Sequence, residues 1–137
     1  MRSLALICTA ALAASCTAPS PQEIAAAQSR EIVDLQRALN GAVPAGPAVP
    51  CLPTSRADGQ TNVSDNIILF RSGGTYYRND PPGGCNGLGR GNYALVTRSI
   101  GPSLCRGDIA TVADLSTGTT VGSCVLGDFV PYRRPGR

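Results

Sequence analysis

Four cysteines in the second part of the chain constrain its fold more than any other feature. They are Cys51, Cys85, Cys105 and Cys124, separated by 33, 19 and 18 residues. Structural zinc sites use closely spaced pairs such as C-x-x-C, and this spacing has none, so we expect no metal site. Two disulfides are the better interpretation. Four cysteines allow three pairings, and the sequence leaves them open. We favour Cys85–Cys105 around a central strand, with Cys51–Cys124 joining the ends of the domain.

The N-terminus is typical of a secretory signal peptide over residues 1–15. A basic start at Arg2 is followed by an uncharged run, rich in Ala and Leu, that is too short to span a membrane. Small residues then precede Cys16, which resembles the bacterial lipobox, where the peptide is cut before the cysteine and the sulfur receives diacylglycerol. We therefore predict lipidation at Cys16. An ordinary signal peptide cut at the same place is the alternative.

The number of remaining cysteines and the residue after Cys16 both indicate where in the cell the protein is located. Loss of Cys8 with the signal peptide and lipidation of Cys16 leave four cysteines, an even number for an oxidising compartment. Thr17 stands where retention at the inner membrane uses Asp. The predicted location is the cell envelope, with the lipid anchored in the outer membrane and the protein facing the periplasm. A soluble secreted or periplasmic protein is the alternative.

Residues 16–50 are predicted to form a lipidated stalk. Ser20 and Glu23 form a capping box at the start of an amphipathic helix over residues 21–39. We expect the apolar stripe of this helix to dock on the domain, or the helix to be partly disordered. A coiled coil is disfavoured, because two heptads are too few to persist alone. The proline-rich end of this segment predicts an extended spacer. The stripe consists of Ile32, Leu35 and Leu39.

Residues 51–137 are predicted to form a four-cysteine β domain. Short β-favouring runs alternate with turn residues, without the βαβ alternation of a parallel sheet. The expected fold is all-β: a small five- to six-stranded antiparallel barrel or sandwich with disulfides, preceded by the signal peptide and one amphipathic helix. The predicted strands cover residues 66–71, 75–78, 93–98, 108–115 and 120–126, with a weak first strand at 56–63.

The first two of these strands flank Ser72-Gly73-Gly74, which indicates a β-hairpin. The two-residue loop is either Ser72-Gly73 or Gly73-Gly74. We favour the first, because it places Phe70 opposite Thr75 on one face.

The chain has no His, Lys or Trp, so all twelve basic residues are Arg. This composition excludes a Ser-His-Asp or Cys-His nucleophile, a Schiff-base lysine and a His-ligated metal. The carboxylates of the domain are six Asp residues, most of them beside turn formers, and we interpret them as turn residues. A small hydrolase with two of them facing one cleft is the alternative. They are Asp58, Asp65, Asp80, Asp108, Asp114 and Asp128. We predict no catalytic residue and no cofactor.

The domain carries nine Arg against six Asp, and three of the arginines stand near the C-terminus. We interpret Arg133, Arg134 and Arg137 as a solvated basic tail, with attraction to anionic lipid or to an envelope polymer as the alternative. Few aromatic residues are available to stack on bases, so no nucleic acid is expected as a partner.

The domain resembles an uncharacterised family of proteobacterial envelope proteins, the domain-of-unknown-function family numbered 6491. The resemblance covers Cys51 to about Tyr132 and implies a small four-cysteine domain in the cell envelope, with a lipoprotein-like N-terminus in many members. It implies no catalytic residue. The shared pattern comprises Cys51, Ile67-Ile68-Leu69-Phe70-Arg71, Tyr77-Arg78-Asn79, Cys85-Asn86-Gly87-Leu88, Leu104-Cys105-Arg106-Gly107-Asp108 and Cys124-Val125-Leu126-Gly127-Asp128-Phe129-Val130-Pro131.

These observations predict an envelope lipoprotein whose domain is a non-catalytic binding or structural module, tethered to a membrane through the lipid on Cys16. Two alternatives remain: a small Asp-dependent hydrolase, and a disulfide-rich, inhibitor-like secreted protein.

Overall fold

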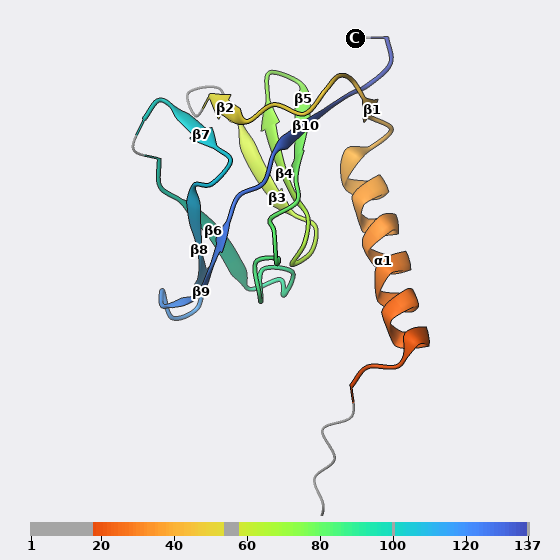
Figure 1. The fold of residues 1–137 in the computed structure, drawn as a ribbon, viewed down its shortest axis with the longest axis vertical. Coiled ribbons are helices and arrows are strands. Elements are labelled where there is room, and N and C mark those ends of the chain that lie inside the picture. Colours follow the sequence, from red (N-terminus) through yellow and green to blue (C-terminus); the bar gives the residue numbers. More distant parts are fainter. Residues whose placement is uncertain (1–17, 54–57, 100, 137) are drawn as a thin grey trace, which may run out of the picture.

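The computed structural model describes residues 18–53, 58–99 and 101–136 (Figure 1). The predicted signal peptide, Cys16 and Arg137 lie outside the described residues. One helix precedes ten strands in the described chain. They are α1 (Pro21–Leu39), β1 (Val43–Pro44), β2 (Cys51–Pro53), β3 (Gly59–Asn62), β4 (Ile68–Ser72), β5 (Thr75–Asn79), β6 (Tyr93–Thr97), β7 (Ser103–Cys105), β8 (Ile109–Asp114), β9 (Thr120–Val125) and β10 (Phe129–Arg133).

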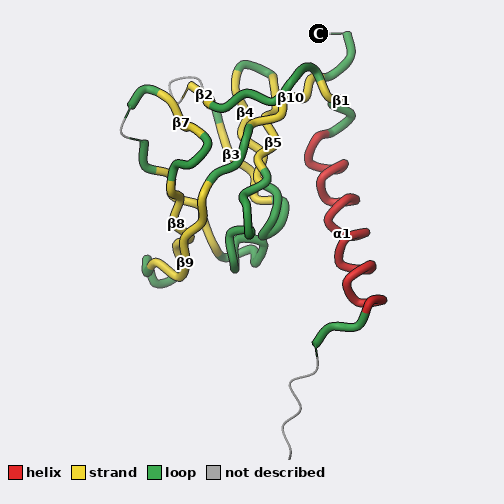
Figure 2. Tube along the Cα trace, viewed as in Figure 1, coloured by secondary structure: helices red, strands yellow, loops and turns green. Residues whose placement is uncertain are grey.

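The strands form three antiparallel sheets (Figure 2). The largest has the order β1-β10-β5-β4-β3, a second pairs β2 with β7, and the third has the order β6-β8-β9. The all-β prediction is confirmed in its coarse form. A closed barrel is not: in the described chain, β1 and β3 end the large sheet without pairing with each other. The strand number also exceeds the prediction, because β1, β2, β7 and β10 were missed.

The β4–β5 hairpin forms as predicted, but with the other loop. Ser72 pairs with Thr75 and Phe70 with Tyr77, so the two-residue loop is Gly73-Gly74. Both glycines have positive φ, 54° and 81°. A two-residue hairpin loop of this kind needs positive φ at both central positions, which glycine adopts without strain and serine does not.

The three sheets enclose one apolar core. β4 and β10 contribute Phe70 and Phe129, whose rings meet edge to face with centroids 5.6 Å apart. Leu52 and Leu104 come from the two-stranded sheet, and the three-stranded sheet adds Val112. The core therefore depends on packing between sheets, as in a layered β fold.

A second, smaller apolar cluster joins α1 to the other face of the large sheet. Leu35 and Leu39 from the C-terminal half of the helix pack with Ile67 and Leu69. Ile32, predicted to share this stripe, is 55% exposed. The helix covers the predicted residues, and its capping box is present, with the side chains and backbones of Ser20 and Glu23 bonded reciprocally. Across the described residues, no helix is long and apolar enough to cross a bilayer.

The segment predicted to be an extended spacer is part of the sheet. β1 pairs with β10, with Val43 opposite Arg133. Further along, the backbones of Val49 and Phe129 exchange hydrogen bonds of 2.9 Å in both directions. Residues 43–49 thus run beside β10 and fix the helix against the domain (Figure 1).

All four domain cysteines form disulfides, as predicted, but the favoured pairing was wrong. The bonds are Cys51–Cys105 and Cys85–Cys124. Cys51 lies directly opposite Cys105 in the β2–β7 register. The predicted Cys85–Cys105 bond around β6 does not form, because β7, which carries Cys105, pairs with β2 and not with the β6-β8-β9 sheet. These two disulfides fit an oxidising, extracytoplasmic compartment.

Candidate functional site

The turn end of the β4–β5 hairpin borders a pocket of about 640 Å³. We call it the arginine pocket, because three of its lining side chains carry guanidinium groups. Its lining consists of Arg71, Gly73, Gly74, Thr75, Tyr76, Arg133 and Arg134.

Strand register brings these residues together from distant parts of the sequence. Arg71 lies opposite Tyr76 in the hairpin. Tyr76 in turn lies opposite Tyr132 of β10. Because β10 runs antiparallel to β5, its C-terminal end reaches the hairpin turn and places Arg133 and Arg134 beside it. Two residues of the predicted basic tail are therefore held at the sheet, and Arg134 is half-buried.

The polar groups of the pocket are only partly satisfied. Arg133 Nε donates to the hydroxyl of Thr75 at 3.1 Å, and Thr75 is buried. Arg134 Nε is shielded from solvent and has no hydrogen-bond partner among the described residues. A buried donor without an acceptor costs about 1–3 kcal/mol. Arg134 thus keeps one buried N–H without an acceptor among the described residues.

Carboxylates are missing from the described lining. Asp58 contacts one lining residue, because its Oδ2 accepts the N–H of Gly73 at 2.8 Å, but it does not itself line the pocket. The ion pairs in the described part of the chain lie elsewhere: Arg37–Asp34, Arg78–Asp80 and Arg106–Asp128. Hence Arg71, Arg133 and Arg134 are not neutralised by an acidic side chain there.

The six domain carboxylates, from which a hydrolase pair would have to come, are each engaged by a hydrogen bond or an ion pair within the domain. Four accept backbone N–H groups and two form ion pairs. The acceptors are Asp58 (from Gly73), Asp65 (from Gly87 and Gly89), Asp108 (from Cys105) and Asp114 (from Ser116), and the ion pairs are Asp80–Arg78 and Asp128–Arg106. Turn chemistry accounts for Asp108 and Asp114, whose partners lie within three residues of them. Asp58 and Asp65 instead accept from loops that are distant in the sequence.

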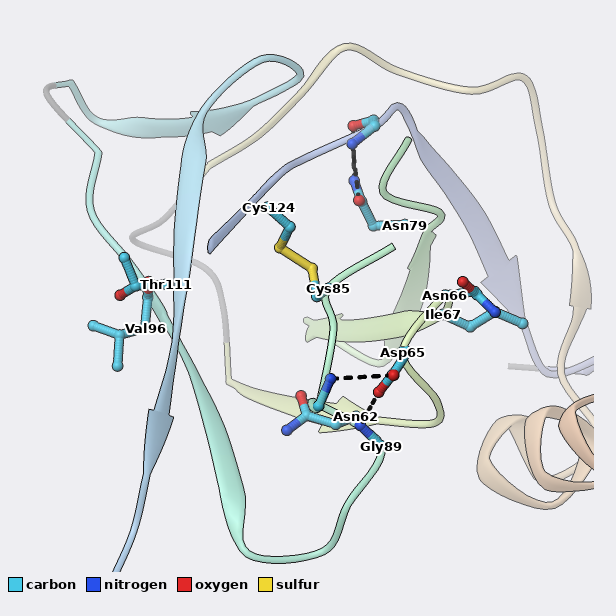
Figure 3. The surroundings of a disulfide bond; sticks show 12 residues. Asn62, Asp65, Asn66, Ile67, Asn79, Cys85, Gly89, Val96, Thr111 and Cys124 are labelled. Atoms are coloured by element: carbon cyan, nitrogen blue, oxygen red, sulfur yellow. Dashed lines mark hydrogen bonds between the residues drawn. A yellow bond between two sulfur atoms is a disulfide. The ribbon is translucent and has the colours of Figure 1, made fainter. Parts of the chain in front are cut away.

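Asp65 shows how such a carboxylate organises a loop (Figure 3). Its side chain accepts the N–H of Gly87 at 3.1 Å and of Gly89 at 2.7 Å, and its carbonyl accepts the N–H of Cys85 at 2.6 Å. A Cβ at Gly84 would lie 2.8 Å from the side-chain oxygen of Asn66. This glycine-rich loop therefore wraps closely around Asp65 and delivers Cys85 to its disulfide.

Two carboxylates have a pKa below the ordinary value. Hydrogen bonds from the side chain and backbone of Ser116 lower the pKa of Asp114. The capping hydrogen bonds from the backbone and side chain of Ser20 lower the pKa of Glu23. Both effects stabilise the charged carboxylate at a turn or helix end, which is the opposite of what a general acid requires.

The sequence grouped Arg133 and Arg134 in a basic tail, interpreted as solvated, and did not connect Arg71, Thr75 or Tyr76 with them. Arg71 lies in a predicted strand, where an arginine ordinarily indicates a solvent-facing position. Only the antiparallel pairing of β5 with both β4 and β10 brings it to the C-terminal arginines.

The chain was compared with models of protein families, with curated proteins and with solved structures, and it matches none of them. The arginine pocket is therefore interpreted from its own chemistry.

Proposed function

We propose that this protein is a cell-envelope lipoprotein whose disulfide-braced β domain is a non-catalytic binding module. In this proposal, Cys16 carries diacylglycerol and an acylated amine, and these chains hold the protein in the outer membrane, facing the periplasm. Several chains give lasting attachment where a single chain gives only reversible binding. The partners are the membrane, reached through this lipid, and an anionic lipid or envelope polymer. No nucleic acid is involved.

The engagement of all six domain carboxylates carries the non-catalytic part of this proposal. A glycosidase-like pair needs two carboxyl groups facing one cleft, one of them with a raised pKa. Asp114, by contrast, has a lowered pKa, and the arginine pocket has no carboxylate in its described lining. This arrangement favours binding of an anion over acid–base chemistry.

Membrane fractionation of a Cys16→Ser variant tests the tether. We expect the unaltered protein to incorporate labelled fatty acid and to stay in the membrane fraction at high salt, while the variant loses both properties. Cys8→Ser is the matched control: it removes a cysteine that leaves with the signal peptide, and lipidation should persist. Membrane retention of Cys16→Ser at high salt would refute the tether.

Two further assays separate the alternative functions. Turnover of a polymeric substrate that is abolished by one Asp→Asn change in the domain would establish the hydrolase. Stoichiometric capture of a periplasmic or foreign enzyme would establish the inhibitor. We expect neither turnover nor capture of an enzyme. Crosslinking in the native envelope should instead link the protein to lipids of the anchoring membrane and to an acidic ligand.

A further inference from the structure

We propose that the arginine pocket binds a phosphate group carried by a soluble or polymeric ligand, and not by the lipid headgroups of the leaflet that anchors the protein. This inference rests on the proposed function for the orientation of the domain. It adds to that function a defined site, a chemical class of ligand and a direction of approach.

Charge is the first argument. Arg71, Arg133 and Arg134 line one pocket of about 640 Å³, and no described carboxylate lines it with them. Three like charges near one another repel, and an anion placed among them removes that repulsion and gains attraction to each. The described ion pairs all use arginines outside this pocket. An acidic ligand is therefore the natural complement.

The buried Nε of Arg134 is the second argument. It has no acceptor among the described residues, whereas Arg133 Nε has the Thr75 hydroxyl. That hydroxyl oxygen accepts from Arg133, and a hydroxyl that accepts can also donate its own hydrogen to a ligand. An oxygen-rich anion would supply acceptors to both groups once the Arg134 guanidinium turned its shielded Nε toward the pocket.

The number of donors favours phosphate over carboxylate. One guanidinium fork already matches the two oxygens of a carboxylate, whereas a phosphate has enough oxygens to accept from several forks. Side chains do not crowd the entrance at the turn: Gly73 and Gly74 have positive φ, and each would have open space around an added Cβ. A phosphate can thus approach the three arginines along the hairpin tip.

Geometry favours a ligand away from the anchoring membrane. The helix begins at Pro21, five residues after Cys16 in the sequence, and its 19 residues extend about 28 Å. The C-terminal end of the helix is followed by β1, which pairs with Arg133 of β10. The hairpin turn and the N-terminal end of α1 therefore lie at opposite ends of the molecule (Figure 1). Anchored through Cys16, the protein would turn the pocket away from its own leaflet.

Calorimetric titration of the mature protein in uncharged detergent with inorganic polyphosphate, and separately with inorganic phosphate, tests the site. We expect saturable binding at low salt that weakens as salt rises. Arg134→Gln and Arg71→Gln should each reduce the affinity about tenfold or more, as expected for loss of a hydrogen bond to a charged group. Arg98→Gln is the matched control, because Arg98 is exposed and outside the pocket, and it should change the affinity less than about twofold.

Three outcomes would overturn the inference. The first is no binding of either probe at low salt. The second is an equal loss of affinity in Arg98→Gln and Arg134→Gln, which would indicate nonspecific attraction to net charge. The third is Arg134-dependent binding to phosphatidylglycerol vesicles without binding to polyphosphate, which would assign the site to headgroups. Circular dichroism and thiol labelling of each variant check that the fold and disulfides persist.

The lipid-labelling experiment keeps the two proposals separable. If the protein is lipidated but does not bind polyphosphate, only the proposed phosphate site is refuted. Protein that binds polyphosphate but is not labelled at Cys16 would refute the tether, and with it the argument about direction, while the anion site itself would stand.

Discussion

The two apolar clusters use opposite faces of the same strand but are held together differently. In β4, Ile68 and Phe70 face the main core, while Leu69 faces the helix. The main core is enclosed by three sheets and includes the buried Cys85–Cys124 disulfide. The helix-covered cluster is smaller and includes no cysteine. The comparison indicates that the main core sets global stability, whereas the helix-covered cluster decides where α1 and its N-terminal extension lie.

Truncation in the main core should have the largest effect. Phe129→Ala removes a fully buried ring that packs against Phe70, and we expect a loss of about 3–5 kcal/mol in the free energy of unfolding. Denaturant unfolding followed by fluorescence or circular dichroism measures it. Ile109→Ala, at a side chain that is 63% exposed, is the control and should change little. A small effect of Phe129→Ala would contradict the described core.

Removal of the disulfides should come next. The Cys85→Ala/Cys124→Ala and Cys51→Ala/Cys105→Ala proteins should each lose about 2–4 kcal/mol. We expect the larger loss for the first pair, because both of its cysteines are buried whereas Cys51 is exposed. Thermal melts of the two variants measure the difference. Peptide mapping that finds Cys85 bonded to Cys105 in the unaltered protein would contradict the described pairing.

The helix-covered cluster should be separable from the main core. Leu39→Ala should cost about 2 kcal/mol, near the low end for a buried leucine, because the cluster is small. Amide hydrogen exchange should speed up in α1 while β8 and β9 stay protected. Ile32→Ala, at an exposed position on the same helix, should leave both rates unchanged. Equal acceleration in the helix and the core would show that the two clusters unfold as one unit.

Acidification should have the smallest effect, and in α1 it should act at the N-terminal end of the helix. The pKa of Glu23 is lower in the folded protein than in the unfolded chain, because of its bonds with Ser20. Its contribution is therefore complete above the unfolded pKa and is lost as the pH falls below about 4 toward the folded pKa. Helical ellipticity should fall slightly over this range. Glu23→Gln, which keeps the size but not the charge, should remove the pH dependence, and an unchanged titration would contradict the capping role.

Local features of the sequence were sufficient for several elements. Ser20, Glu23 and the following apolar spacing predicted the bounds of α1, because a helix start depends on groups within one turn. The turn role predicted for the Asp residues holds locally for Asp108 and Asp114, which accept N–H groups within three residues. The long-range partners of Asp58 and Asp65 were not predicted. The spacing of the four cysteines predicted disulfides instead of zinc, since no close pair exists to hold a metal.

Long-range strand pairing decided the rest. β10 was missed because Pro131 discourages a strand assignment, although the strand lies between β5 and the short β1. The disulfide partners followed from which strands meet, with Cys51 opposite Cys105 in a sheet formed by segments far apart in the sequence.

The sequence by itself thus determined the helix, the turns, the β class and the set of bonded cysteines, since these depend on neighbouring residues or on composition. Only the tertiary structure decided the pairing of the cysteines, the choice of Gly73-Gly74 as the hairpin loop and the meeting of Arg71 with Arg133 and Arg134. The physical reason is register: which residues face one another across antiparallel strands depends on burial of both faces of β4 at once, and no local pattern encodes that condition.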